Sequence, residues 1–170
     1  MTRPPLAGIH HVKIPVTDLA RSVDWYTKVF DFRVLMEFAE ADGIVRGVAG
    51  EAPGLGVTQL TFRFNPKAAE GCRGFDPVSF AVNDHPDIQA WAAHLDTLGI
   101  RHSPVIEASV GWLLVFNDPD GLELHIYSWA AHGIDHSDKP GYGRPVHPPN
   151  TGDRTARLTP ERPTASGNLP

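Results

Sequence analysis

Two histidines and a glutamate stand in segments whose pattern predicts strands with one polar face. His11 lies within residues 9–16, while Glu123 and His125 lie within residues 122–128. Successive strand side chains point to opposite sides, so all three residues face away from their apolar neighbours. Imidazole is the commonest metal ligand, and both imidazole and carboxylate groups transfer protons. These residues are either unrelated side chains on a solvated sheet face or parts of one site.

The same alternation places further polar groups away from the apolar face of each strand. Gln59 and Arg63 share a face of residues 57–64. Lys13 shares a face with His11, and Tyr127 shares a face with His125. Such strands form either a solvated sheet or a curved sheet around a pocket. His10, by contrast, is expected on the side that packs against a helix.

An internal repeat relates the two halves of the first 130 residues. A constant shift of 66 positions carries Asp18 to Asp84, Trp25 to Trp91 and Leu60 to Ile126. A repeat of this kind indicates that one supersecondary unit occurs twice.

Each half has the pattern of one strand, one helix and three further strands. Apolar residues recur at helical spacing after Asp18 and again after Asp84, and the two aspartates are candidate helix caps. We therefore predict an α+β fold of two βαβββ modules. The expected elements are strands at 9–16, 33–38, 44–49, 57–64, 77–83, 102–107, 111–117 and 122–128, and a helix after the first strand of each half.

The predicted domain covers residues 8–130, with modules at about 8–65 and 75–128. Residues 131–170 are rich in Pro, Thr, Arg and Gly, which predicts an extended or disordered tail. Its histidines, His132, His136 and His147, are expected at the surface.

Composition limits the classes of function. A net charge of −5 argues against nucleic-acid binding, which usually leaves a basic footprint. The sequence contains no run of ~18 apolar residues, so we predict no membrane-spanning helix. The single cysteine, Cys72, cannot form an intrachain disulfide, and no apolar leader precedes Gly8. We expect a cytoplasmic protein.

The motifs resemble those of the vicinal oxygen chelate superfamily, which includes glyoxalases, bleomycin resistance proteins and extradiol dioxygenases. The matching stretches are residues 9–19 (IHHVKIPVTDL), Ser22, Trp25, Tyr26 and Phe30, Gly111-Trp112, and residues 116–121 (FNDPDG). The resemblance covers about residues 8–128. It implies two modules that form a curved mixed sheet around a small-molecule pocket.

The resemblance also implies up to four equivalent metal-ligand positions on the concave side of that sheet. These map onto His11, Gln59, Pro77 and His125. Pro77 has no side-chain donor, which leaves His11, Gln59 and His125 as the expected ligands, with a gap for water or substrate. A set with two imidazoles fits a divalent ion such as Zn, Fe, Ni or Mn.

Two classes of function follow from the resemblance. In the first, the protein is a metal-dependent isomerase, lyase or dioxygenase, in which Glu123 or Tyr127 transfers protons. Lys13, Arg63 and Trp112 would then contact a small oxygen-rich substrate, and the two positive charges would favour a carboxylate, enolate or phenolate oxygen.

In the second, it is a metal-free protein that sequesters a small molecule or antibiotic between aromatic side chains, or a metal-free enzyme with the same pocket. The resemblance implies a homodimer in either case.

Overall fold

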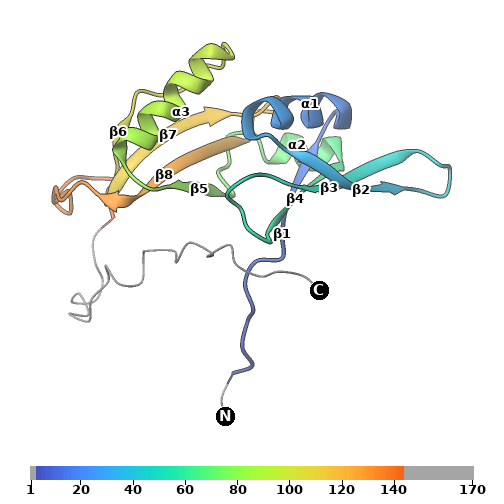
Figure 1. Cartoon of the computed structure of the whole chain (residues 1–170), viewed down its shortest axis with the longest axis horizontal. Helices are drawn as coiled ribbons and strands as arrows, with labels where there is room; N and C mark the ends of the chain where they lie inside the picture. The colour runs from blue at the N-terminus through green and yellow to red at the C-terminus, as the bar shows by residue number, and fades with distance from the viewer. Residues whose placement is uncertain (1–2, 144–170) are drawn as a thin grey trace, which may run out of the picture.

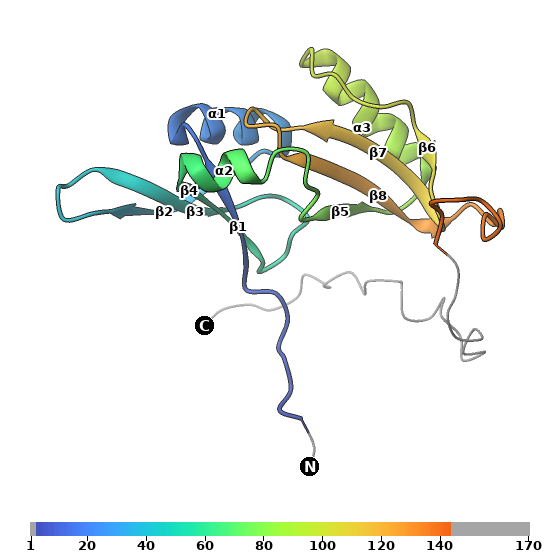
Figure 2. The same cartoon turned by 180° about the vertical axis from the view of Figure 1, so that it is seen from behind.

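The computed structural model describes residues 3–143 of the chain, and these form two structural modules in sequence order. Helices α1 and α3 lie on the same side of the sheets, and the N-terminal segment leaves from the other side (Figures 1 and 2). The elements are β1 (His11–Val16), α1 (Leu19–Phe30), β2 (Arg33–Ala39), β3 (Val45–Glu51), β4 (Gln59–Phe64), α2 (Pro66–Gly71), β5 (Ser79–Val82), α3 (His85–Thr97), β6 (Ile106–Glu107), β7 (Gly111–Asn117) and β8 (Glu123–Ala131).

The two modules have the same sheet topology. The strand orders are β1-β4-β3-β2 and β5-β8-β7-β6, so the first strand of each module pairs with its last. The β1–β4 and β5–β8 pairs are parallel, and the other pairs are antiparallel. This arrangement confirms the predicted α+β fold of two βαβββ modules.

Aspartates begin both long helices, as their positions in the repeat predict. The Asp18 carboxylate accepts a hydrogen bond from the Arg21 backbone N–H at 3.0 Å, and Asp84 accepts one from Asp87 at 3.2 Å. A side-chain acceptor of this kind satisfies one of the unpaired N–H groups of a helix start. The α1 helix ends at Phe30, and its C-cap residue, Asp31, adopts a left-handed conformation with φ of 52°.

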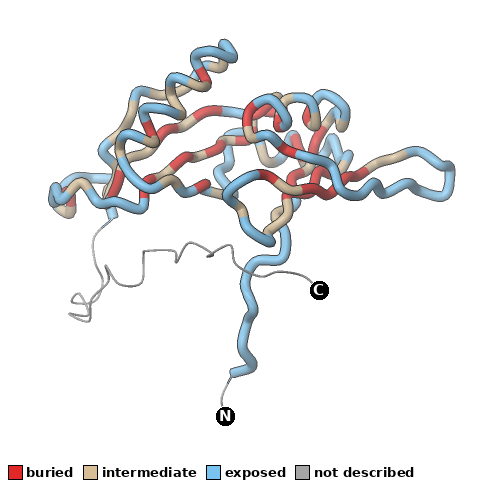
Figure 3. Tube along the Cα trace, in the orientation of Figure 1, coloured by how far each residue is buried: buried red, intermediate tan, exposed pale blue. Residues whose placement is uncertain are grey.

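Apolar side chains between the helices and the sheets form one continuous core. In the first module Tyr26 of α1 packs over Phe62 of β4, with ring centroids 4.4 Å apart. Phe30 extends this core to the second module, because its ring lies 4.8 Å from Phe80 and 5.4 Å from Trp91. Figure 3 shows buried positions in the strands beneath the helices and exposed positions in the tip of the β2–β3 hairpin.

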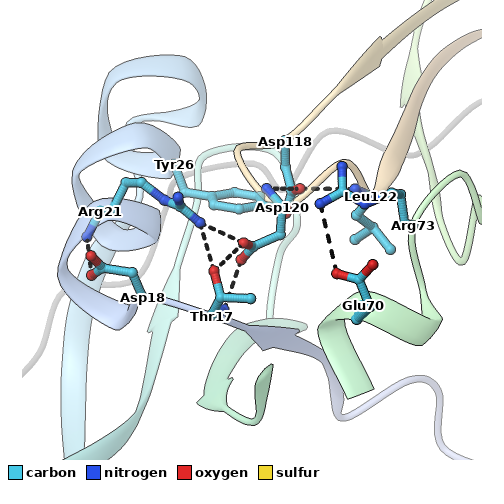
Figure 4. Close-up of polar contacts among 9 residues, drawn as sticks. All are labelled: Thr17, Asp18, Arg21, Tyr26, Glu70, Arg73, Asp118, Asp120 and Leu122. Carbon is cyan, nitrogen blue, oxygen red and sulfur yellow. Dashed lines mark hydrogen bonds and ion pairs between the residues drawn. The ribbon is translucent and has the colours of Figure 1, made fainter. Parts of the chain in front are cut away.

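A buried polar network also joins the modules (Figure 4). Asp120, in the β7–β8 turn, is 4% exposed and accepts hydrogen bonds from the Thr17 backbone N–H at 2.9 Å, from the Thr17 hydroxyl and from Arg21. These partners belong to the β1–α1 junction of the other module. We call this group of Thr17, Arg21 and Asp120 the inter-module clasp.

Asp118 stabilises the turn that carries the clasp. Its Oδ1 atom accepts backbone hydrogen bonds from Asp120 at 2.8 Å and Leu122 at 2.9 Å, and the Tyr26 hydroxyl donates to its Oδ2 atom at 3.2 Å. Burial raises the pKa of Asp118 above its ordinary value, and burial together with the nearby Asp118 charge raises the pKa of Tyr26 well above its own. Tyr26 is therefore a neutral hydrogen-bond donor to this carboxyl.

Three local features differ from the sequence expectation. Helix α2 was not expected, although Asn65 caps it and Pro66 occupies its first turn, which is a recognisable start signal. The strand expected at residues 102–107 is reduced to β6 and an isolated bridge between His102 and Phe116.

The third difference concerns the region after residue 131. Residues 132–143 lie against the second module, where His132 Nε2 is 2.8 Å from the Ala108 carbonyl oxygen. The expectation that His136 lies at the surface is wrong, because only 3% of it is exposed. His147 and the rest of the predicted tail lie outside the described residues.

Removal of the clasp carboxylate should destabilise the protein. Asp120→Ala removes a buried acceptor from the half-buried Thr17 and from the exposed Arg21, so we expect the free energy of unfolding to fall by about 2 kcal/mol. Chemical denaturation measures this, with Asp24→Ala as the control because Asp24 forms only an exposed pair with Lys28. Equal effects of the two substitutions would contradict a role for the clasp.

Candidate functional site

The face of the first sheet opposite α1 holds a cavity whose lining includes several polar side chains. Parallel pairing places His11 of β1 opposite Gln59 of β4, and Lys13 opposite Thr61. A cavity of about 360 Å³ covers these positions. Its lining residues are His10, His11, Lys13, Met36, Phe38, Gly47, Ala49, Gln59, Thr61, Phe62 and Arg63.

The positive charges of this cavity differ in their surroundings. Arg63 pairs with Glu40, which also lies 3.5 Å from Arg46. Arg46 in turn binds Asp42 at 2.8 Å, and this hydrogen bond lowers the pKa of Asp42 to about 2. Lys13 forms no ion pair within residues 3–143. Lys13 is therefore the cation best placed to meet an anionic group in the cavity.

His10 lies in this cavity as well, contrary to expectation. It precedes β1, is exposed, and its Nδ1 atom is 3.1 Å from Nδ1 of His11. The strand alternation that assigned His10 to the helix side begins only at His11, where the ladder with β4 begins. Two imidazoles therefore meet at this end of β1.

A second polar cluster lies on the second sheet, around His125 of β8. The His125 Nε2 atom lies 2.8 Å from Oε1 of Glu123, and its Nδ1 atom lies 3.6 Å from Oδ2 of Asp76. One ligand atom from each residue lies within 4.8 Å of the others. The His125 side chain is 14% exposed, whereas Glu123 is 34% and Asp76 51% exposed. The cluster thus combines a shielded imidazole with two carboxylates that solvent reaches.

Asp76 was missed by the sequence reasoning because the chain bulges before β5. The Glu123 N–H donates to the Phe75 carbonyl at 3.0 Å, and two residues further along β8, His125 lies opposite Ser79. In the regular ladder of the first module, the equivalent step from the His10–Gln59 hydrogen bond to the Lys13–Thr61 pair covers three residues against two, so the segment before β5 holds one additional residue. The bulge includes Pro77, which has no N–H to donate to a ladder. Ser79, rather than Pro77, therefore lies opposite His125, and the constant shift of 66 fails at this point.

The expected metal ligands fall on two different sheets. His11 and Gln59 share the cavity of the first sheet, while His125 lies in the cluster of the second. No hydrogen bond or ion pair joins these two groups in the described part of the chain. Their convergence on one ion stays a prediction.

Tyr127 and Trp112 have structural contacts. The Tyr127 hydroxyl accepts from the backbone N–H groups of Val110 at 3.2 Å and Gly111 at 3.3 Å. The Trp112 ring stacks on His85 of α3, with centroids 4.1 Å apart, so it lies on the helix-covered side of its sheet. These positions favour neither the proton-transfer role expected for Tyr127 nor the substrate contact expected for Trp112.

A larger, mostly apolar cavity of about 720 Å³ lies between the two modules. Strands β1 and β5 each occupy the end of their sheet, and residues of both contribute to the walls. The side chains of Trp91 and Trp129 are part of the lining.

Comparison with known proteins agrees with this architecture. The model of the Glyoxalase/Bleomycin resistance protein/Dioxygenase superfamily matches residues 8–126. The chain belongs to this superfamily. No helix within residues 3–143 of this superfamily member has the length and apolar character needed to cross a membrane.

Two curated proteins match most of the chain. It is 30% identical over 131 residues to the uncharacterized protein YaeR of Escherichia coli, covering 72% of this chain and 96% of that protein. It is 25% identical over 147 residues to the putative ring-cleaving dioxygenase MhqA of Bacillus subtilis, covering 82% of this chain but only 43% of that protein.

Solved structures share the fold. A superfamily domain from Frankia sp. is 29% identical with a TM-score of 0.56, covering 73% of this chain and 98% of that one. TnmS3, an antibiotic binding protein from a Streptomyces species, is 20% identical with a TM-score of 0.60, covering 74% and 98%. The FosX fosfomycin resistance protein of Listeria monocytogenes, complexed with Mn(II), is 12% identical with a TM-score of 0.57, covering 73% and 94%. The last two likenesses show the fold alone.

The contacts of Tyr127 lead to a test of its role. Tyr127→Phe removes the acceptor for two backbone N–H groups, so we expect the free energy of unfolding to fall by about 0.5–1.5 kcal/mol. Metal and ligand binding should stay unchanged when measured by calorimetry on the folded variant. Unchanged stability together with lost activity would instead assign proton transfer to the hydroxyl.

Proposed function

We propose that this protein is a metal-dependent enzyme of the isomerase, lyase or dioxygenase type that acts on a small oxygen-rich molecule. The observation that carries the proposal is the contact of His125 with Glu123, beside Asp76, on the face of the second sheet away from α3. When bound, a divalent metal supplies Lewis-acid polarisation of substrate oxygens.

The donor chemistry of the cluster fits such an ion. His125 offers an imidazole nitrogen, and Glu123 offers a carboxylate whose Oε1 atom lies 2.8 Å from Nε2. Mixed nitrogen and oxygen donors suit Zn, Fe, Ni or Mn. The carboxylate also supplies the negative charge that the expected set of His11, Gln59 and His125 lacks. We retain His11 and Gln59 as additional ligands in the proposal.

The remaining polar groups have roles that follow from their positions. Lys13 would hold a carboxylate, enolate or phenolate oxygen of the substrate, since it forms no ion pair within the described residues. Arg63 would contribute less, because Glu40 already balances its charge. Only Oε1 of Glu123 contacts His125, so its second oxygen is the group we assign to accept a proton from the substrate.

We further infer that the protein is a homodimer. Strands β1 and β5 each have only one neighbour in the described sheets, so their outer backbone groups lack strand partners. Apolar side chains near these edges are exposed, including Ile9 at 67% and Trp129 at 51%. A second copy that covers both edges would bring the His11–Gln59 face of one chain toward the His125 cluster of the other. This arrangement would unite all the proposed ligands.

A second candidate function is metal-free binding of a small molecule or antibiotic. What favours it is the 720 Å³ cavity with Trp91 and Trp129 in its walls. Its size is typical of small-molecule pockets, and indole rings offer stacking surface to planar ligands. The first candidate function requires a bound metal ion, whereas the second requires none.

Elemental analysis and titration with Zn²⁺ and Mn²⁺ distinguish the two candidate functions. We expect about one ion per chain in the wild type, loss of that ion in His125→Ala, and weaker binding in His11→Ala and Glu123→Gln. His85→Ala serves as the control, because His85 lies on the helix side of the second sheet against Trp112. No stoichiometric metal in the wild type would refute the enzyme proposal and leave the binding-protein candidate.

The dimer is tested by sedimentation velocity at micromolar concentrations. We expect the wild type to sediment as a dimer and Ile9→Glu to shift the equilibrium toward monomer, because a charge at the uncovered edge opposes its burial. Val110→Glu is the control, since Val110 is 60% exposed in the β6–β7 turn. A monomeric wild type across the range would rule out the proposed interface.

A further inference from the structure

The first described residues form an extended segment that leaves the fold. Residues 3–8, which we call the N-terminal arm, are all exposed and belong to no helix or strand. Figures 1 and 2 show this segment projecting from β1 on the side opposite the helices, and Figure 3 shows that it is exposed along its length. Leu6 is 85% exposed, so the arm carries an apolar side chain that its own chain leaves uncovered.

The sequence of the arm favours one extended conformation. Pro4 and Pro5 have fixed φ angles, and each restricts the residue before it to the β or polyproline II region. A polyproline II segment rises about 3.1 Å per residue, so six residues span roughly 19 Å. A segment with so little conformational freedom loses little entropy when it binds.

The apolar cavity between the modules has the chemistry that binds such a segment. Phe30, Trp91 and Trp129 contribute aromatic rings to its lining, and 51% of Trp129 is exposed. Grooves lined by aromatic rings commonly bind proline-rich segments in the polyproline II conformation. The cavity therefore fits the prolines and the leucine of the arm.

Charge complementarity supports the same occupant. Asp87 also lines the cavity, and its Oδ2 atom accepts the backbone and side-chain N–H groups of Asn83 at 3.0 and 2.9 Å. Neither Asp87 nor Arg3 forms an ion pair within residues 3–143. The Asp87 carboxylate can therefore accept a guanidinium group through Oδ1.

We propose that the N-terminal arm of each chain occupies the apolar cavity of a second copy, with Leu6 against the indole rings and Arg3 toward Asp87. This inference rests on the proposed homodimer and makes the cavity part of its interface. No residue of the arm lines the cavity of its own chain, although Ile9, the residue that follows the arm, does. A two-fold axis would exchange both arms, so the contact would close in a dimer.

Disulfide trapping in the full chain tests this contact directly. Cys72 is first replaced by Ser, and Ala7→Cys is combined with Ala90→Cys, because Ala90 is an exposed residue of α3 in the cavity lining. In the control pair Ala7→Cys is combined with Val110→Cys, since Val110 lies in the β6–β7 turn outside the lining. We expect oxidation to give a disulfide-linked dimer with the first pair and monomer with the control pair. Mass spectrometry identifies the joined peptides.

Sedimentation velocity measures what the arm contributes to the dimer. Leu6→Ser should raise the dissociation constant of the dimer about 10-fold, because a leucine side chain loses its burial. Val57→Ser is the matched control, at a residue that is 94% exposed outside the cavity. Arg3→Asp and Asp87→Arg should each weaken the dimer, and their combination should recover part of the loss. Thermal unfolding verifies that each variant folds.

Other results would overturn the arm contact while the homodimer stands. A disulfide within one chain would show that the arm occupies its own cavity, and a dimer without an Ala7–Ala90 disulfide would show that the arm lies elsewhere. Equal binding of anilinonaphthalene sulfonate to the wild type and to Leu6→Ser, with loss of binding in Trp129→Ala, would show a cavity open to small molecules. A monomeric wild type overturns both the arm contact and the homodimer.

Discussion

The carboxylate of Asp120 is buried at the boundary between the modules, where Thr17 and Arg21 supply its hydrogen-bond donors. A buried charge is costly without partners, so the turn that carries Asp120 is stable only when the β1–α1 junction lies against it. Asp118 gives the turn its shape through its own backbone hydrogen bonds, and Tyr26 of the first module donates to it. The β7–β8 turn thus satisfies its polar groups by contact with the other module.

This constraint extends to the candidate site because β8 begins directly after the turn. Leu124 and Ile126 point into the core, and the alternation of the strand turns Glu123 and His125 to the opposite face. The clasp fixes the start of the strand, the core fixes its inward face, and the polar residues are consequently held on the outer face. The inter-module contact therefore helps to orient the residues proposed to perform the chemistry.

Much of the fold could be predicted from local sequence rules. Asp18 and Asp84 cap the helices as their side chains predict, and alternation correctly separated Phe62 and Ile126 from Gln59 and His125. Asp76 could not be found in this way, because a bulge changes the register without leaving a periodic signal. The burial of His136 was likewise missed, since it depends on tertiary contacts of a segment whose composition is polar.

The two modules have diverged in chemistry while keeping one topology. The first carries two neighbouring histidines, Gln59 and Lys13, and the second carries His125 with two carboxylates. Nitrogen donors therefore predominate in the cavity of the first sheet, whereas two carboxylates flank the histidine of the second.

The central claim is that His125 and Glu123 hold a metal ion. The most direct measurement is anomalous X-ray diffraction from crystals of the protein loaded with Mn²⁺ or Zn²⁺. The account predicts one strong anomalous peak beside Nε2 of His125 and the Glu123 carboxylate. A loaded crystal with no peak at these side chains, or with its peak elsewhere on the chain, would contradict it.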